Sequence, residues 1–96
     1  MNFIESDDLL TCRLPARLDT ISSQAIETEL VEKIENFKRK IIFDFSDVTF
    51  ISSYFLRILL NALKKVGVEN LEVIKVSSEI KKVFKIAGFD KYLNIN

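Results

Sequence analysis

The sequence predicts an α/β fold in which helices pack on a small mixed β-sheet. Segments of strand composition alternate with segments of helical periodicity through the central and C-terminal parts of the chain. This alternation implies parallel strands joined by right-handed crossovers. Two strand-like segments precede it across a short turn, and we expect them at the sheet edge. Two glycines and one proline in 96 residues leave little room for a linker, so residues 1–96 are predicted to form a single domain.

The N-terminal third is predicted to hold two strands and an acidic helix. Residues 2–5 and 8–14 have strand composition, and apolar and polar residues alternate in the second segment, as in a strand with one covered face. From Ser22 or Ser23 to about Phe37, apolar residues recur at near-helical spacing while four glutamates occupy other faces. This pattern predicts an amphipathic helix.

The remaining elements alternate between strand and helix. Glycines directly after two of the helical patterns are typical helix ends. The predicted elements are a strand over Lys40–Phe45, a helix over Ser53–Val66 ending at Gly67, a strand over Leu71–Val76, a helix over Ser78–Ala87 ending at Gly88, and a short strand over Tyr92–Ile95.

The stretch from Ile41 to Ser53 is where we expect the functional site. An apolar strand runs through the turn formers Ser46 and Asp47 into a second short apolar run, and then into Ser52 and Ser53 at a helix start. A hydroxyl there lies beside unpaired backbone N–H groups at the positive end of the helix dipole, which would also receive a phosphate. Two interpretations of Ser53 therefore stay open, a helix N-cap and a phosphorylation site.

The helix that follows Ser53 is predicted to present two different faces. Its core stripe consists of Leu56, Leu59, Leu63 and Val66. Phe55 and Ile58 widen the apolar arc, so we expect part of it to stay exposed, where a partner or a second copy in a homodimer could bind. Tyr54 and Arg57 lie with Ser53 on the opposite face. Arg57, four residues after Ser53, could pair with a phosphate or be a solvated surface charge.

Composition excludes several classes of chemistry. Cys12 is the single cysteine and there is no histidine, so an internal disulfide, a cysteine-based metal site and Ser-His or Cys-His catalysis are excluded. Asp44 and Asp47 could form an acid pair, but without convergent ligands they are interpreted as turn formers. A further hypothesis is a small enzyme or nucleotide-binding domain, but the chain has no glycine-rich phosphate loop to support it. We expect no cofactor, no metal and no enzymatic activity.

The charges cancel overall but are divided unevenly along the chain. Fourteen basic and fourteen acidic residues give no global field for nucleic acid or an anionic membrane, so neither is expected as a partner. Residues 1–37 carry eight acids and three bases, whereas the remainder carries a net charge of +5. Either the two halves attract each other within the fold, or an acidic helix and a basic patch face different partners. Without a secretory segment or an apolar run of about 20 residues, we expect a cytoplasmic protein with no membrane insertion.

Three segments together resemble the STAS family, the small domains of bacterial anti-sigma factor antagonists and of sulfate-transporter tails. Leu14–Asp19 resembles the family's "G-x-L-D", Phe43–Ser53 its "D-x-S-x-V-x-F-[IM]-D-S", and Ala87-Gly88-Phe89 its "G-[LF]". The resemblance implies a STAS-like fold and an anti-sigma factor antagonist that binds a kinase-type anti-sigma factor. It places Ser53 at the residue that the partner kinase phosphorylates.

The resemblance also implies a partner-binding surface around this serine. The residues expected there are Ser52, Ser53, Tyr54, Phe55, Arg57 and Ile58. The family usually has Ser-Gly-Leu-Gly after the serine, whereas this chain has the bulkier Tyr54–Arg57, and Ser52 stands where Asp is most common. These departures favour an alternative, a non-phosphorylated STAS adaptor subunit of a transporter ATPase or a signalling scaffold.

Overall fold

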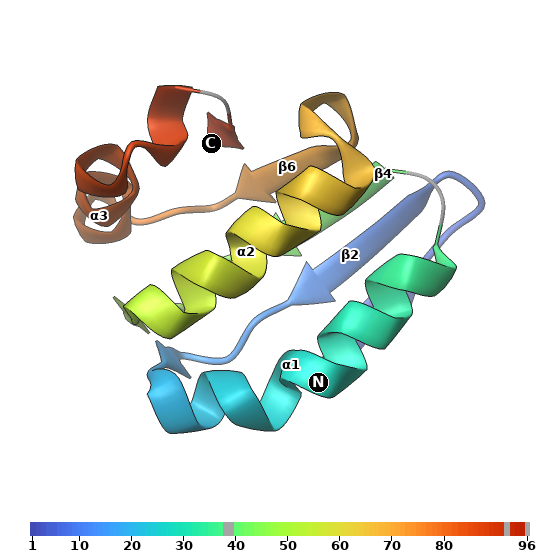
Figure 1. Ribbon diagram of the computed structural model, residues 1–96, viewed down its shortest axis with the longest axis horizontal. Coiled ribbons are helices and arrows are strands. Elements are labelled where there is room, and N and C mark those ends of the chain that lie inside the picture. The colour runs from blue at the N-terminus through green and yellow to red at the C-terminus, as the bar shows by residue number, and fades with distance from the viewer. Residues whose placement is uncertain (38–39, 92, 96) are drawn as a thin grey trace.

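The main β-sheet has the strand order β1-β2-β4-β6-β7 (Figure 1). The computed structural model describes residues 1–37, 40–91 and 93–95. Its sheet strands are β1 (Asn2–Glu5), β2 (Leu9–Arg13), β4 (Lys40–Asp44), β6 (Leu71–Ile74) and β7 (Asn94–Ile95). β1 is antiparallel to β2, and the other neighbouring strands are parallel. The predicted mixed sheet is therefore confirmed, with β1 at one edge and β2 between β1 and β4.

A second, much smaller sheet links the main sheet to the helices. β3 (Arg17–Leu18) pairs in parallel with β5 (Phe50–Ile51), and each strand ends directly before a helix. Neither strand was predicted, because two residues are too few to show a period-2 pattern. The two short strands lie side by side at the end of the molecule where α1 and α2 begin (Figure 1).

The three helices take different positions relative to the sheet. α1 (Thr20–Asn36) and α2 (Ser53–Val66) lie side by side and run in the same direction, whereas α3 (Ser78–Ala87) lies past the carboxyl end of β6 (Figure 1). Single 3-10 turns follow α2 and α3, η1 (Val68–Asn70) and η2 (Phe89–Lys91). Within the described residues, no helix is long and apolar enough to cross a bilayer.

The helix ends agree with the sequence except at the start of α1. The predicted bounds of α2 and α3 are confirmed, and Gly88 takes the left-handed conformation, with φ of 84°, that ends α3. α1 begins at Thr20, not at Ser22 or Ser23, because the Asp19 carboxylate already caps it. Three strands are shorter than predicted, namely β2, β4 and β6. The last strand covers Asn94–Ile95, and the start predicted for it, Tyr92, lies outside the described residues.

Phenylalanine rings join the central strand to two helices. Phe43 and Phe45 lie on the same side of the chain in and just after β4, and both are buried. The ring of Phe55 from α2 lies 6.4 Å from Phe43 and 6.2 Å from Phe45, measured between centroids. Phe84 of α3 lies 5.6 Å from Phe45. These four rings hold α2 and α3 against β4.

We predict that Phe55→Ala lowers the free energy of unfolding by about 3–5 kcal/mol, because it leaves a cavity between β4 and α2. Arg57→Ala, an exposed change on the same helix, is the matched control and should stay within about 0.5 kcal/mol of wild type. Urea denaturation followed by circular dichroism measures both, with Phe55→Leu as a milder variant. Equal losses in the Phe55 and Arg57 variants would contradict this packing.

Candidate functional site

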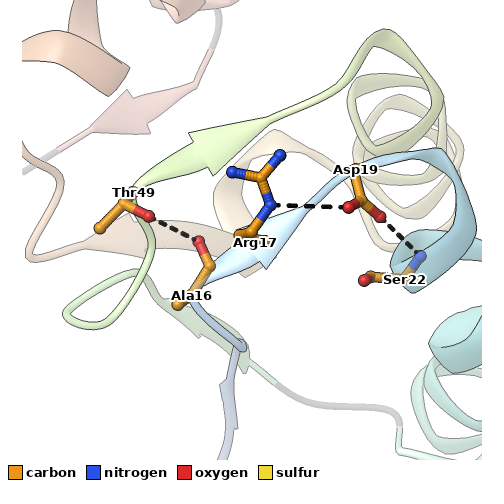
Figure 2. Close-up of polar contacts among 5 residues, drawn as sticks. All are labelled: Ala16, Arg17, Asp19, Ser22 and Thr49. Carbon is orange, nitrogen blue, oxygen red and sulfur yellow. Dashed lines mark hydrogen bonds and ion pairs between the residues drawn. The ribbon is translucent and has the colours of Figure 1, made fainter.

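The starts of α1 and α2 lie next to each other because β3 and β5 pair. The N–H of Ser52 donates to the Leu18 carbonyl at 2.8 Å, at the end of the small sheet. At its other end, both the N–H and the hydroxyl of Thr49 donate to the Ala16 carbonyl, the hydroxyl at 3.3 Å (Figure 2). Two helix N-termini, each carrying partial positive charge, therefore point to the same end of the molecule.

The two helix starts are capped by different groups. The Asp19 carboxylate accepts a hydrogen bond from the Ser22 N–H at 2.8 Å and lies 3.7 Å from the Arg17 guanidinium (Figure 2). The Ser22 hydrogen bond lowers the pKa of Asp19, and Arg17 acts in the same direction. At α2 the cap is the neutral hydroxyl of Ser52, which accepts from the Phe55 N–H at 3.3 Å.

Ser53 is the first residue of α2, not its cap. The capping role that the sequence allowed for Ser53 belongs to Ser52, which has the extended backbone of an N-cap with φ of −95° and ψ of 163°. The side chain of Ser53 is exposed. The first turn of α2 carries no acidic residue. The Ser53 hydroxyl is therefore accessible at a helix N-terminus whose cap, Ser52, is neutral.

Tyr54 and Arg57 form a contact beside Ser53. The Arg57 guanidinium lies over the Tyr54 ring, 5.0 Å from its centroid. The Tyr54 hydroxyl donates to the Glu27 carboxylate of α1, and this hydrogen bond raises the pKa of Tyr54. Tyr54 thus connects the first turn of α2 to α1 and holds the guanidinium on the same face as Ser53.

Phe55 and Ile58 do not belong to this surface. Phe55 is 0% exposed and Ile58 is 3% exposed, so neither contributes to an exposed part of the apolar arc. Leu56 and Val66, which were expected in the core stripe, are instead only half-buried. The arc is wide because α2 packs on two neighbours, with Phe55 against Phe43 of β4 on one side and α1 on the other. Phe55 and Ile58 therefore have a core role and offer no surface to a second copy in a homodimer.

The structure adds exposed residues that sequence reasoning missed. Phe50 in β5 is 43% exposed and Ile21 at the start of α1 is 79% exposed. The Arg17 guanidinium lies 4.8 Å from the centroid of the Phe50 ring. In the two-residue strand β5, Ile51 faces the core, and alternation then turns Phe50 outward. That alternation was the available signal, but it required β5 to be recognised as a strand.

The acidic residues of the turn before β5 have structural partners. The Ser46 N–H donates to Asp44 at 2.9 Å, and Asp47 lies 3.3 Å from Arg13. Burial raises the pKa of Asp44, but the Ser46 hydrogen bonds and the charges of Lys75 and Arg13 together outweigh it and lower the value. The turn-former interpretation of Asp44 is confirmed. Within the described residues, no three or more side chains of Asp, Glu or Cys lie together so that they could hold a metal ion.

Comparison with known proteins identifies the family. A family model described as the STAS domain matches residues 1–96. This chain belongs to the STAS family. Among curated proteins, the STAS chain is 25% identical over 85 residues to BtrV of Bordetella bronchiseptica, which is named as an anti-sigma factor antagonist. The alignment covers 86% of this chain and 73% of BtrV.

Solved structures of STAS proteins share the fold. The structure of an anti-sigma-factor antagonist (STAS) domain protein from Planctomyces limnophilus has a TM-score of 0.86 at 19% identity. The match covers 99% of this chain and 86% of the Planctomyces chain. SpoIIAA of Bacillus has been solved unphosphorylated, with a TM-score of 0.78 at 18% identity and coverage of 99% and 88%. Its phosphorylated form has a TM-score of 0.70 at 19% identity and coverage of 99% and 91%.

We predict that Ser52→Ala lowers the free energy of unfolding by about 1 kcal/mol, since the Phe55 N–H loses its acceptor. Ser53→Ala should change it by less than about 0.5 kcal/mol, because the hydroxyl is an exposed surface group. Chemical denaturation distinguishes the two. If the Ser53 variant lost as much stability as the Ser52 variant, the assignment of Ser52 as the cap would be wrong.

We also predict that Asp19→Asn flattens the acid limb of the stability profile. The folded-state pKa of Asp19 is lowered, so the ionised carboxylate stabilises the fold above the unfolded value of about 3.9. This contribution is lost as the pH falls through the lower folded-state pKa. Thermal midpoints between pH 7 and about 2 should fall less steeply for Asp19→Asn than for wild type below about pH 4. Asp8→Asn, which removes an exposed carboxylate that caps no helix and forms no ion pair within the described residues, should retain the steeper limb.

Proposed function

We propose that this STAS domain is an anti-sigma factor antagonist that binds a kinase-type anti-sigma factor and releases it when Ser53 is phosphorylated. One observation carries the proposal: the Ser53 hydroxyl is exposed at the first position of α2. The resemblance to the family motif implies that this is the serine that the partner kinase phosphorylates. The name of BtrV and the two solved forms of SpoIIAA support it. The protein acts in the cytoplasm as a binding module, and the phosphoryl-transfer chemistry belongs to the partner.

The proposed partner surface lies at the end of the molecule where α1 and α2 begin. Ser53, Tyr54 and Arg57 form its centre, Ser52 lies at its edge, and the buried Phe55 and Ile58 only support it from below. Arg17, Ile21 and Phe50 extend it across the small sheet. Aromatic and arginine side chains are enriched among the residues that carry binding energy, and the two arginine–ring contacts offer such groups in ordered positions.

The switch follows from the charge of a phosphate. Phosphorylation would add about −1.5 to −2 charges and three acceptor oxygens to the middle of a contact that buries aromatic and apolar groups. The partner would then have to desolvate that charge. In the free protein, the positive end of α2 and the Arg57 guanidinium stabilise it, because Arg57 lies four residues along the same helix face. Both effects lower the affinity of the phosphorylated form.

A specific observation favours the second candidate function, a constitutive adaptor subunit of a transporter ATPase or a signalling scaffold. Tyr54 and Arg57 stack beside Ser53 at positions where small residues are usual in the family. A kinase that approached this helix start closely would meet these larger side chains. In an adaptor, the same surface would bind its partner without modification.

We predict that Ser53→Asp lowers the affinity for the anti-sigma factor by about tenfold or more, equivalent to at least about 1.4 kcal/mol. Ser53→Ala should bind like wild type. α3 supplies a matched control, since Ser77 caps it and the exposed Ser78 is its first residue, as Ser52 and Ser53 are in α2. Ser78→Asp should therefore leave binding unchanged.

The measurement is capture from a native-host extract by the four baits in parallel, with quantitative mass spectrometry. Recovery of a histidine-kinase-like ATPase by wild type, Ser53→Ala and Ser78→Asp, and its loss with Ser53→Asp, supports the switch. Equal recovery of the same transporter or scaffold proteins by every bait overturns the switch and favours the adaptor.

A further inference from the structure

A groove of about 420 Å³ lies between α1 and α2. Its lining includes Val31 and Ile34 from α1 and Ile58 and Ala62 from α2. Three of these residues are buried in the core and Val31 is half-buried, so the lining is largely apolar. The small side chain of Ala62 leaves space where the two helices pass each other. The volume is within the range of about 300–1,000 Å³ that is typical of small-molecule sites.

Two contacts between the helices limit the length of the groove. Near the start of α2, the Tyr54 hydroxyl donates to Glu27, and near its end the Lys65 ammonium contacts Glu35. Glu27 and Glu35 are eight residues apart on α1, or about 12 Å along the helix axis. A helix or strand of a partner cannot run through so short a space. The groove therefore suits a small molecule.

The charges around the groove favour an acid group at one position. Lys65 is already paired with Glu35, and Glu27 already accepts a hydrogen bond from Tyr54. Lys64 also lines the groove and is exposed, and no acidic residue within the described part of the chain forms an ion pair with it. Within the described residues the Lys64 ammonium is therefore an unpaired cation at a groove that Asn61 also lines.

We propose that the groove between α1 and α2 binds a small amphiphilic carboxylate, with its apolar body against Val31, Ile58 and Ala62 and its carboxylate at the Lys64 ammonium. Burial of the alkyl body supplies most of the affinity, because it removes apolar surface from water. The ion pair with Lys64 orients the ligand and distinguishes an acid from an alcohol of the same length. The site requires neither phosphorylation of Ser53 nor a protein partner.

The test is a titration of the ¹⁵N-labelled protein with octanoate, followed by amide chemical shifts. Saturable shifts are expected at the amides of α1 and α2 that line the groove. Lys64→Gln should weaken binding about fivefold or more, whereas Lys82→Gln, which removes an exposed lysine on α3, should leave it unchanged. Ala62→Leu fills the hollow and should abolish binding.

Two further ligands separate the contributions of the chain and the acid group. 1-Octanol should bind more weakly than octanoate, and acetate should cause no saturable shift. Shifts spread over the lysines of α3, equal affinities of octanoate and 1-octanol, or equal effects of the Lys64 and Lys82 variants would each overturn the proposal. Lys64 is exposed, so its variant remains informative if Ala62→Leu fails to fold. Because no arm involves Ser53, failure of this titration leaves the proposed function standing.

Discussion

Insertion of the Phe55 ring against Phe43 and Phe45 sets the orientation of α2, and the candidate site depends on that orientation. Successive helical residues are rotated by about 100°, so Ser53 and Arg57, each two residues from Phe55, are turned about 200° away from it. Both side chains are therefore directed outward when Phe55 is directed inward. The same geometry places Ser53 and Arg57 within about 40° of each other on the helix. The core thus determines which hydroxyl is presented and which guanidinium accompanies it.

Pairing of β3 with β5 adds an electrostatic asymmetry to this arrangement. It brings two helix N-termini together, but the carboxylate of Asp19 offsets the positive end of α1. The neutral hydroxyl of Ser52 leaves the positive end of α2 without a compensating charge in its first turn. The favourable field for an anion is therefore concentrated at α2, next to Ser53.

Local signals in the sequence predicted much of the fold. Gly67 and Gly88 and the apolar stripe of α2 define two helices within residues that are neighbours in the chain. The errors arose where the answer depends on distant residues. Ile58 is buried only because α1 lies beside it, and Phe50 is exposed only because the adjacent Ile51 occupies the core side of β5. Ser52 and Ser53 have the same side chain, so only the backbone at the helix start decides which one is the cap.

The uneven charge distribution also becomes clear only in three dimensions. The ion pair Glu35–Lys65 joins an acid of the first half to a base of the second, as the interpretation of mutual attraction expects. Arg13–Asp47 also joins the halves, but in the opposite sense. α3 differs, because among the described residues no acidic side chain forms an ion pair with its three lysines, Lys81, Lys82 and Lys85. Within the described residues, the basic half therefore retains charge that forms no ion pair at the end of the molecule where α3 lies.

The similar starts of α2 and α3 have a consequence for enzyme specificity. Each begins with a pair of serines, of which the first caps the helix and the second is exposed. An enzyme that recognised only a hydroxyl at the first position of a helix would meet two equivalent substrates in one chain. Selection of one serine would need groups from other elements, such as Arg17 and Phe50 beside α2. A short peptide around Ser53 would lack Arg17 and the folded arrangement, so an enzyme that selected Ser53 in this way would require the intact domain and not the linear motif alone.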